Sequence, residues 1–140
     1  MMSVREMCQQ VAVIPVLVVN EVEQAAPLAT ALVTGGLPVL EVTLRTPAAL
    51  DVIRAMSEVP GSRVGAGTVL TPADVKAVKA AGAVFAVSPG ATDTLIKAAE
   101  DEGLALLPGA STASEVMYLL ERGYTTQKFF PAEAAGASPC

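Results

Sequence analysis

The stretch of sequence that indicates the fold runs from residue 39 to residue 70 and reads VLEVTLRTPAALDVIRAMSEVPGSRVGAGTVL. It begins with an apolar, β-branched run at residues 39–44 and ends with a second such run at residues 64–70, and both have the composition that strands prefer. Between them, Thr46 and Pro47 offer a helix start before residues with helical spacing. The stretch therefore predicts one strand, helix, strand unit.

The same unit recurs on both sides of this stretch. Further apolar runs bounded by Gly or Pro lie at residues 11–19, 84–88, 104–107 and 128–130. The intervening helices have predicted starts and glycine ends, the starts at Asn20, Thr71-Pro72, Thr92 and Ser111 or Thr112, and the ends at Gly35-Gly36, Gly82, Gly103 and Gly123. Six strands and five helices are expected, in units of roughly 20 to 25 residues.

Two α/β architectures use such repeats. A doubly wound sheet normally carries a G-x-G-x-x-G turn after its first strand, and residues 19–22 read VNEV instead. The uniform repeat favours a (β/α)8 barrel of the TIM type, which needs eight strands. The 140 residues therefore predict a single, incomplete barrel domain over residues 1–140, truncated after an irregular tail at residues 132–140. An open barrel would expose unpaired strand edges, so association with other chains is expected.

Composition excludes several classes of function. The net charge is -5 and the nine basic residues are scattered, which argues against a nucleic-acid partner. There is no histidine and no C-x-x-C spacing, because Cys8 and Cys140 lie near opposite ends, so no metal or cofactor is expected. The longest apolar run, residues 11–19, is too short to cross a bilayer. A soluble cytoplasmic protein without a membrane partner is predicted.

Polar side chains alternate with apolar ones in residues 40–45. Strand geometry sends Glu41, Thr43 and Arg45 to one side, and Val42 and Leu44 to the other. In a barrel the apolar side faces the helices, so the carboxylate, hydroxyl and guanidinium are predicted to face the interior near the active-site end. A structural ion pair between Glu41 and Arg45 is the alternative, since buried charges require partners.

Lys128 differs from the other lysines. Lys76, Lys79 and Lys97 fall in predicted helices, where a solvated charge is ordinary. Lys128 stands in the strand sequence QKFFP, with Phe130 on the same side. A lysine among aromatic rings loses hydration, which favours the neutral amine that attacks carbonyl carbons. From spacing alone, a lysine that extends from a strand end into water is an equally good interpretation.

Small residues follow three of the predicted strands, at residues 65–68, 88–90 and 108–111. Each segment joins glycine or proline to a hydroxyl side chain. Such turns let the backbone approach a small anion and donate N–H groups to a carboxylate. Taken singly, each segment is better interpreted as an ordinary turn between a strand and a helix.

Five segments taken together resemble one known family: residues 41–46 (EVTLRT), 64–70 (VGAGTVL), 87–90 (VSPG), 107–109 (LPG) and 128–133 (KFFPAE). Their order and spacing are similar to those of the KDPG (2-dehydro-3-deoxy-phosphogluconate) and 4-hydroxy-2-oxoglutarate aldolases. The resemblance implies a class I, metal-independent lyase of the Entner-Doudoroff pathway, a homotrimer of (β/α)8 barrels. Its members cleave a keto acid into pyruvate and an aldehyde, which is glyceraldehyde 3-phosphate or glyoxylate.

Residue roles follow from the resemblance. It implies that Lys128 forms the Schiff base and that Glu41 is the general acid and base. It implies that Arg45 and Thr68 bind the pyruvate carboxylate, and that Pro89 and Phe130 line the pocket. Family members continue past Glu133 through strands seven and eight, whose loops bind the substrate phosphate. A catalytically impaired piece that acts only in assembly is therefore the competing hypothesis, and a nucleotide-binding α/β domain is a weaker one.

Overall fold

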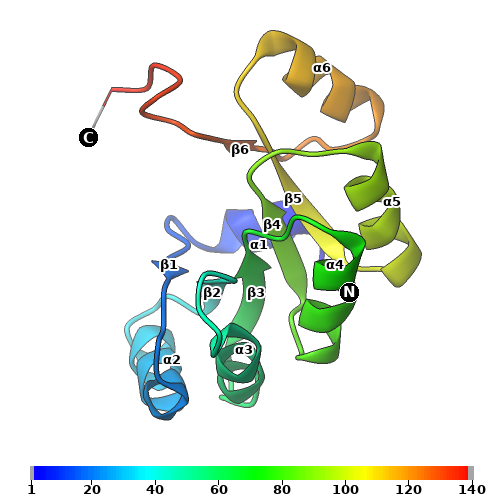
Figure 1. Cartoon of the computed structure of the whole chain (residues 1–140). Coiled ribbons are helices and arrows are strands. Elements are labelled where there is room, and N and C mark those ends of the chain that lie inside the picture. The colour runs from blue at the N-terminus through cyan, green and yellow to red at the C-terminus, as the bar shows by residue number, and fades with distance from the viewer. Residues whose placement is uncertain (1, 139–140) are drawn as a thin grey trace.

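The computed structural model describes residues 2–138, in which six parallel strands form one sheet (Figure 1). The strands are β1 (Val16–Leu17), β2 (Val39–Thr43), β3 (Arg63–Gly67), β4 (Phe85–Ser88), β5 (Ala105–Ala110) and β6 (Lys128–Phe129). The helices are α1 (Val4–Gln10), the 3-10 helix η1 (Val22–Gln24), α2 (Ala25–Thr34), α3 (Ala49–Ser57), α4 (Pro72–Ala80), α5 (Asp93–Glu102) and α6 (Ala113–Glu121). Strand order in the sheet follows chain order, as the barrel prediction requires, although β1 and β6 do not meet.

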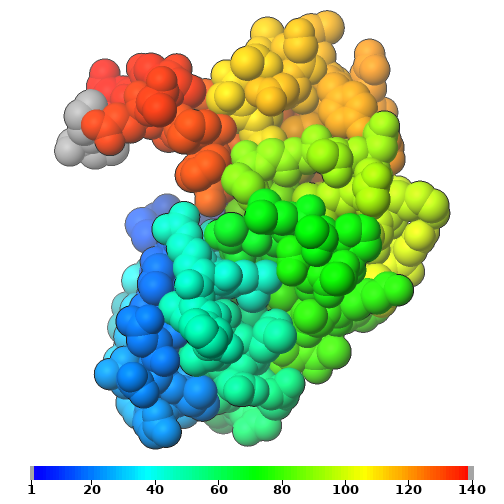
Figure 2. All heavy atoms as spheres, in the orientation of Figure 1, coloured from blue at the N-terminus to red at the C-terminus, as the bar shows by residue number. Residues whose placement is uncertain are grey.

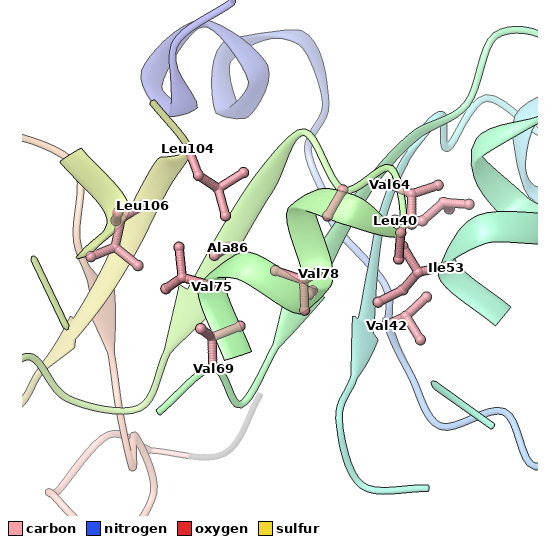
Figure 3. Close-up of a cluster of buried hydrophobic side chains, with 14 of the residues drawn as sticks. Leu40, Val42, Ile53, Val64, Val69, Val75, Val78, Ala86, Leu104 and Leu106 are labelled. Carbon is pink, nitrogen blue, oxygen red and sulfur yellow. The ribbon is translucent and has the colours of Figure 1, made fainter. Parts of the chain in front are cut away.

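Helices α2 to α5 follow one another along one face of the sheet (Figure 1). Every second strand residue points towards them and forms the main core, in which Leu40 and Val42 of β2 pack with Ile53, Val75 and Val78 from the helices (Figure 3). All five are completely buried, and burial of one such side chain contributes about 1.5 to 3 kcal/mol. The prediction that the apolar side of residues 40–45 faces the helices is confirmed.

The opposite face of the sheet, here called the inner face, carries an apolar cluster packed against helix α1. Val39, Phe85 and Val87 form a second buried cluster there with Val4 and Met7 of helix α1. No helix was predicted at α1, so the expectation of five helices was wrong. The signal was present in the sequence, because Ser3 and Glu6 form a capping box at its start.

All six strands differ in bounds from the predicted runs, by one residue in β2, β4 and β6 and by more in β1, β3 and β5. Residues 11–19 were expected as one strand, but β1 contains only Val16 and Leu17 because it pairs on one side only, with β2. Strand β5 is longer than residues 104–107 because its end pairs with β6, Gly109 with Lys128 and Ala110 with Phe129. The residues 108–110, expected in a turn, are therefore part of the sheet.

The helix starts were predicted with mixed success. Thr71, Thr92 and Thr112 each cap a helix by accepting a hydrogen bond from a backbone N–H, which decides between Ser111 and Thr112. The prediction of a helix start at Asn20 was wrong, since α2 begins at Ala25 after η1. The predicted helix start at Thr46 was also wrong. The Thr46 hydroxyl donates to the carbonyl of Val19 (3.0 Å), and α3 begins at Ala49.

The C-terminal part of the described chain projects from the sheet. Residues 130–136 form turns, and neither a helix nor a strand occurs in residues 130–138. In Figure 2 a hollow separates these residues, in red, from the blue and cyan N-terminal part. Cys140 lies outside the described residues, whereas Cys8 is a free, half-buried thiol. Within residues 2–138, no helix is long and apolar enough to span a membrane.

Candidate active site

Glu41 and Lys128 meet on the inner face of the sheet, although they come from strands that are not neighbours. Glu41 lies in the middle of β2 and Lys128 begins β6. The Lys128 Nζ lies 3.9 Å from the Glu41 Oε1. Among residues 2–138, Lys128 is the one ion-pair partner of Glu41. The alternative ion pair between Glu41 and Arg45 is therefore not observed. The fold thus joins an amine and a carboxylate that are 87 positions apart (128 − 41).

The environments of the two groups differ. The Lys128 side chain is 28% exposed and that of Glu41 only 7%. The Lys128 Nζ also lies 4.9 Å from the centre of the Phe130 ring, within the range of a cation–π interaction. Phe129 alternates to the other side and is exposed. The Lys128 amine therefore lies near a carboxylate and one aromatic ring, and the Lys128 side chain stays partly exposed to water.

Burial has the largest effect on the pKa of the Glu41 carboxyl. Loss of hydration raises the pKa of the Glu41 carboxyl above 4.5, and the nearby charges of Lys128 and Arg45 oppose this effect only in part. A carboxyl with a raised pKa can hold a proton at a higher pH than usual and release it again. Glu41 can therefore act as a proton donor and acceptor beside an amine.

The other predicted site residues lie beyond strand ends on the same edge of the sheet. Arg45, Thr68 and Pro89 follow β2, β3 and β4. Arg45 is exposed, because β2 ends at Thr43 and strand alternation does not continue to residue 45. Thr68 has a φ of 59°, a left-handed conformation that is unusual for a β-branched residue. All three therefore lie at the edge of the sheet where the strands end, and the Arg45 charge is near enough to Glu41 to lower its pKa.

Thr43, the remaining polar residue of β2, is buried as predicted. Its hydroxyl donates to the carbonyl of Leu17 in β1 (3.2 Å), so it links the two strands. Lys76, Lys79 and Lys97 lie in helices α4 and α5 and are exposed, as expected. Among the described residues, no cluster of acidic, histidine or cysteine side chains could hold a metal ion.

Gly67 was predicted only as part of the small-residue turn at residues 65–68, but residues 65–67 belong to strand β3. Gly67 lies on the inner face beside Glu41, and a Cβ at this position would collide with the Glu41 carboxylate. Gly65, two residues earlier, makes room for the Phe85 ring in the same way. The G-A-G spacing could have signalled this, because a period of two places both glycines on one face of a strand.

The chain matches one family model over residues 4–140, described as KDPG and KHG aldolase. It is 53% identical over 135 residues to the 2-dehydro-3-deoxy-phosphogluconate aldolase of Pseudoalteromonas atlantica, covering 96% of this chain and 63% of that protein. It is 55% identical over 125 residues to the KHG/KDPG aldolase of Escherichia coli, covering 89% and 59%. The chain therefore spans about three fifths of the length of these curated relatives.

Solved structures agree with these matches. The 2-keto-3-deoxy-6-phospho-gluconate aldolase of Zymomonas mobilis superposes with a TM-score of 0.94 at 48% identity, covering 99% of this chain and 67% of that one. The KDPG aldolase of Legionella pneumophila superposes with a TM-score of 0.89 at 47% identity, covering 96% and 66%. That enzyme holds pyruvate captured at low pH as a covalent carbinolamine intermediate.

Proposed function

The chain belongs to the KDPG and KHG aldolase family, and from this we propose that it carries the pyruvate-binding half of a class I aldolase, with Lys128 as the Schiff-base lysine. The observation that supports the proposal best is the approach of the Lys128 Nζ to the Glu41 Oε1, at 3.9 Å. Imine formation needs an amine nucleophile and a group that moves protons at the same carbon. The two side chains supply both functions within one site.

The proposed reaction begins with the neutral amine of Lys128 and the C2 carbonyl of a keto acid. The nitrogen attacks C2 and gives a carbinolamine, and Glu41 delivers a proton to the C2 oxygen, which leaves as water. The resulting iminium ion accepts the electron pair of the C3–C4 bond as that bond breaks, while the C4 hydroxyl proton passes through water to Glu41. The products of this step are an aldehyde and the enamine of pyruvate on Lys128. Glu41 then returns its proton through water to C3 of the enamine, and hydrolysis of the resulting iminium ion releases pyruvate and the free amine of Lys128.

The remaining proposed residues act on the carboxylate and on the walls of the site. Arg45 and Thr68 follow β2 and β3 at the edge above Glu41, where a guanidinium fork and a hydroxyl can bind a small carboxylate. Pro89 and Phe130 line the pocket, and the Phe130 ring lies 4.9 Å from the Lys128 Nζ. The proposed substrates are the 6-phosphorylated keto acid KDPG, and 4-hydroxy-2-oxoglutarate, which gives pyruvate and glyoxylate.

The proposal extends to the whole domain. Six parallel strands in chain order are consistent with part of a single TIM-type (β/α)8 barrel, and a longer relative superposes on 99% of this chain. We propose a homotrimer in the cytoplasm that acts in the Entner-Doudoroff pathway, with no cofactor. The loops that bind the substrate phosphate are proposed to lie in the part of the relatives that this chain does not span.

Reductive trapping with pyruvate tests the central step. The chain is incubated with pyruvate, reduced with borohydride, digested and analysed by mass spectrometry, and a reduced adduct is expected on Lys128. The variant Lys128→Met is expected to lose the adduct. Lys76→Met, an exposed lysine of α4, is the matched control and is expected to keep it. A folded sample without an adduct on Lys128 would contradict the proposal.

Assembly without catalysis is the second candidate function, because β1 pairs with only one strand among the described residues and its Val16 side chain is exposed. Light scattering combined with the trapping assay separates the two candidates. A defined oligomer that forms no pyruvate adduct supports assembly alone, whereas an adduct on Lys128 supports the aldolase.

A further inference from the structure

We infer that Gly67 is a positioning residue, whose missing side chain provides the space that holds the Glu41 carboxylate beside Lys128. The inference rests on the proposed function of Glu41 as the proton carrier. It adds a residue that acts on the reaction by fixing the position of Glu41.

Strand pairing brings Gly67 to this place. Strands β2 and β3 pair with Glu41 opposite Gly65 and Thr43 opposite Gly67, so the Glu41 side chain leans along the inner face towards Gly67. A Cβ built on Gly67 would lie 2.9 Å from the Glu41 Cδ and 3.0 Å from its Cγ, and would collide with Oε1. These separations are shorter than van der Waals contact between carbon atoms. An alanine at this position therefore requires the carboxylate to move.

Backbone geometry does not explain the glycine. Gly36, Gly61, Gly82, Gly103 and Gly123 have positive φ angles, which other residues adopt only with strain, but Gly67 does not. Its backbone conformation is open to alanine. A side chain at position 67 would occupy the space that the Glu41 carboxylate fills. Glycine is therefore required at this position because of Glu41, and not because of the backbone conformation.

Displacement of the carboxylate would affect the reaction directly. The Oε1 atom that a Cβ would strike is the atom that lies 3.9 Å from the Lys128 Nζ. The Glu41 side chain is 93% buried (100 − 7), and a new position would have to be found inside the packed interior. A misplacement of about 1 Å in a catalytic group can reduce a rate by roughly 100-fold.

A double-mutant cycle tests the inference. The four proteins are the unchanged chain, Gly67→Ala, Glu41→Ala and the double variant, and two quantities are measured: the rate of pyruvate adduct formation on Lys128, and the thermal unfolding midpoint. We expect Gly67→Ala to slow adduct formation by roughly 10- to 100-fold when Glu41 is present, and to change it by less than about twofold in the Glu41→Ala background. Gly35→Ala is the matched control, since Gly35 ends helix α2 with an ordinary helical φ of -77° and a Cβ there comes no nearer than 3.3 Å to another atom, and its rate should stay within about twofold.

The unfolding midpoint keeps the inference testable if the proposed function fails. A chain that forms no adduct would overturn the aldolase proposal, but Gly67→Ala should still lower the midpoint with Glu41 present and not in the Glu41→Ala background. If Gly67→Ala alone does not fold and the double variant does, the inference is supported. Three results would overturn the inference. The first is that Gly67→Ala changes the rate and the midpoint equally in both backgrounds, and the second is that it has no effect when Glu41 is present. The third is that neither Gly67→Ala nor the double variant folds.

Discussion

Burial of Glu41 has a cost that depends on pH. Its pKa is raised by loss of hydration, so between pH 4.5 and the folded pKa the folded chain holds a proton that the unfolded chain releases. The contribution of Glu41 to stability is therefore fully present below about pH 4.5 and is lost as the pH rises through the folded pKa. At neutral pH the buried carboxylate works against folding, which is typical of a residue kept for function.

Glu41→Gln should remove this pH dependence, because glutamine is similar in size and never ionises. We expect the variant and the unchanged chain to have the same unfolding midpoint near pH 4, and the variant to become the more stable as the pH rises. A gain of about 1 kcal/mol corresponds to roughly 3 °C in Tm for a domain of this size. Thermal unfolding followed by circular dichroism between pH 4 and pH 8 measures the difference.

Glu115→Gln is the control of opposite sign. The backbone N–H of Ser111 and the Thr112 hydroxyl donate to the Glu115 carboxylate, and these bonds lower its pKa. Its contribution is therefore present above its unfolded pKa and lost as the pH falls, so this variant should be the less stable one at neutral pH. A Glu41→Gln difference that stays constant from pH 4 to pH 8 would contradict the assignment of burial as the cause.

At the residue scale, strand alternation was right about the direction of Glu41 and Thr43 and wrong about Arg45, which is exposed, and it gave no distances. Strand alternation predicted that Glu41 and Thr43 face the interior, and both are buried there. Alternation carries no information on the gap between strands β2 and β6, so the 3.9 Å approach of Glu41 to Lys128 required the folded chain. The role of Gly67 was not predicted for the same reason, since its importance lies in the atoms of another strand.

At the scale of elements, strand β6 depends on the loop that leads into it. The strand has only two residues, and it pairs only with β5 in the described part of the chain. The side chain of Gln127 donates from Nε2 to the carbonyls of Tyr124 (2.9 Å) and Val116 (3.3 Å). These bonds tie the loop to helix α6 and so fix the residue that precedes Lys128.

Gln127→Ala should therefore loosen β6 and slow the reaction of Lys128 without unfolding the domain. Loss of the hydrogen bonds is expected to cost about 1 to 2 kcal/mol, most of it local to the loop and strand. Hydrogen exchange should speed up at residues 128 and 129, and adduct formation with pyruvate should slow. Gln24→Ala is the matched control, since no side-chain cap hydrogen bond is made by Gln24. Unchanged exchange at residues 128 and 129 would refute the role of Gln127.

Elements were predicted best where local chemistry decides their bounds. Thr71, Thr92 and Thr112 are caps whose hydrogen bonds involve residues three positions away, and all three were predicted. Strand ends depend on partners that are distant in sequence. Strand β1 is short because it has one partner, and β5 is long because β6 pairs with its end. Such pairings are properties of the sheet and are not encoded in a single run of residues.

At the scale of the whole molecule, β1 is an edge with exposed apolar side chains. Val16 in β1 is 54% exposed, and Val13 and Val18, which lie before and after the strand, are 57% and 52% exposed. Strand β1 pairs only with β2 among the described residues. An unpaired strand edge with exposed valines is a template for association with another chain. Strand β1, at which a barrel would close, is thus also the surface through which copies of the chain can associate.

The 140-residue chain is therefore expected to associate as its concentration rises, with a mass by light scattering above that of the monomer. Val16→Lys combined with Val18→Lys places two charges on the edge and should shift the mass towards the monomer, because a charge on an edge strand opposes pairing. Val84→Lys is the matched control, a valine 40% exposed just before β4, and should leave the mass unchanged. If Val84→Lys acts as strongly as the β1 variant, general hydrophobicity and not the β1 edge drives association. If the unchanged chain stays monomeric at every concentration, the edge is protected, and the assembly function loses its physical basis.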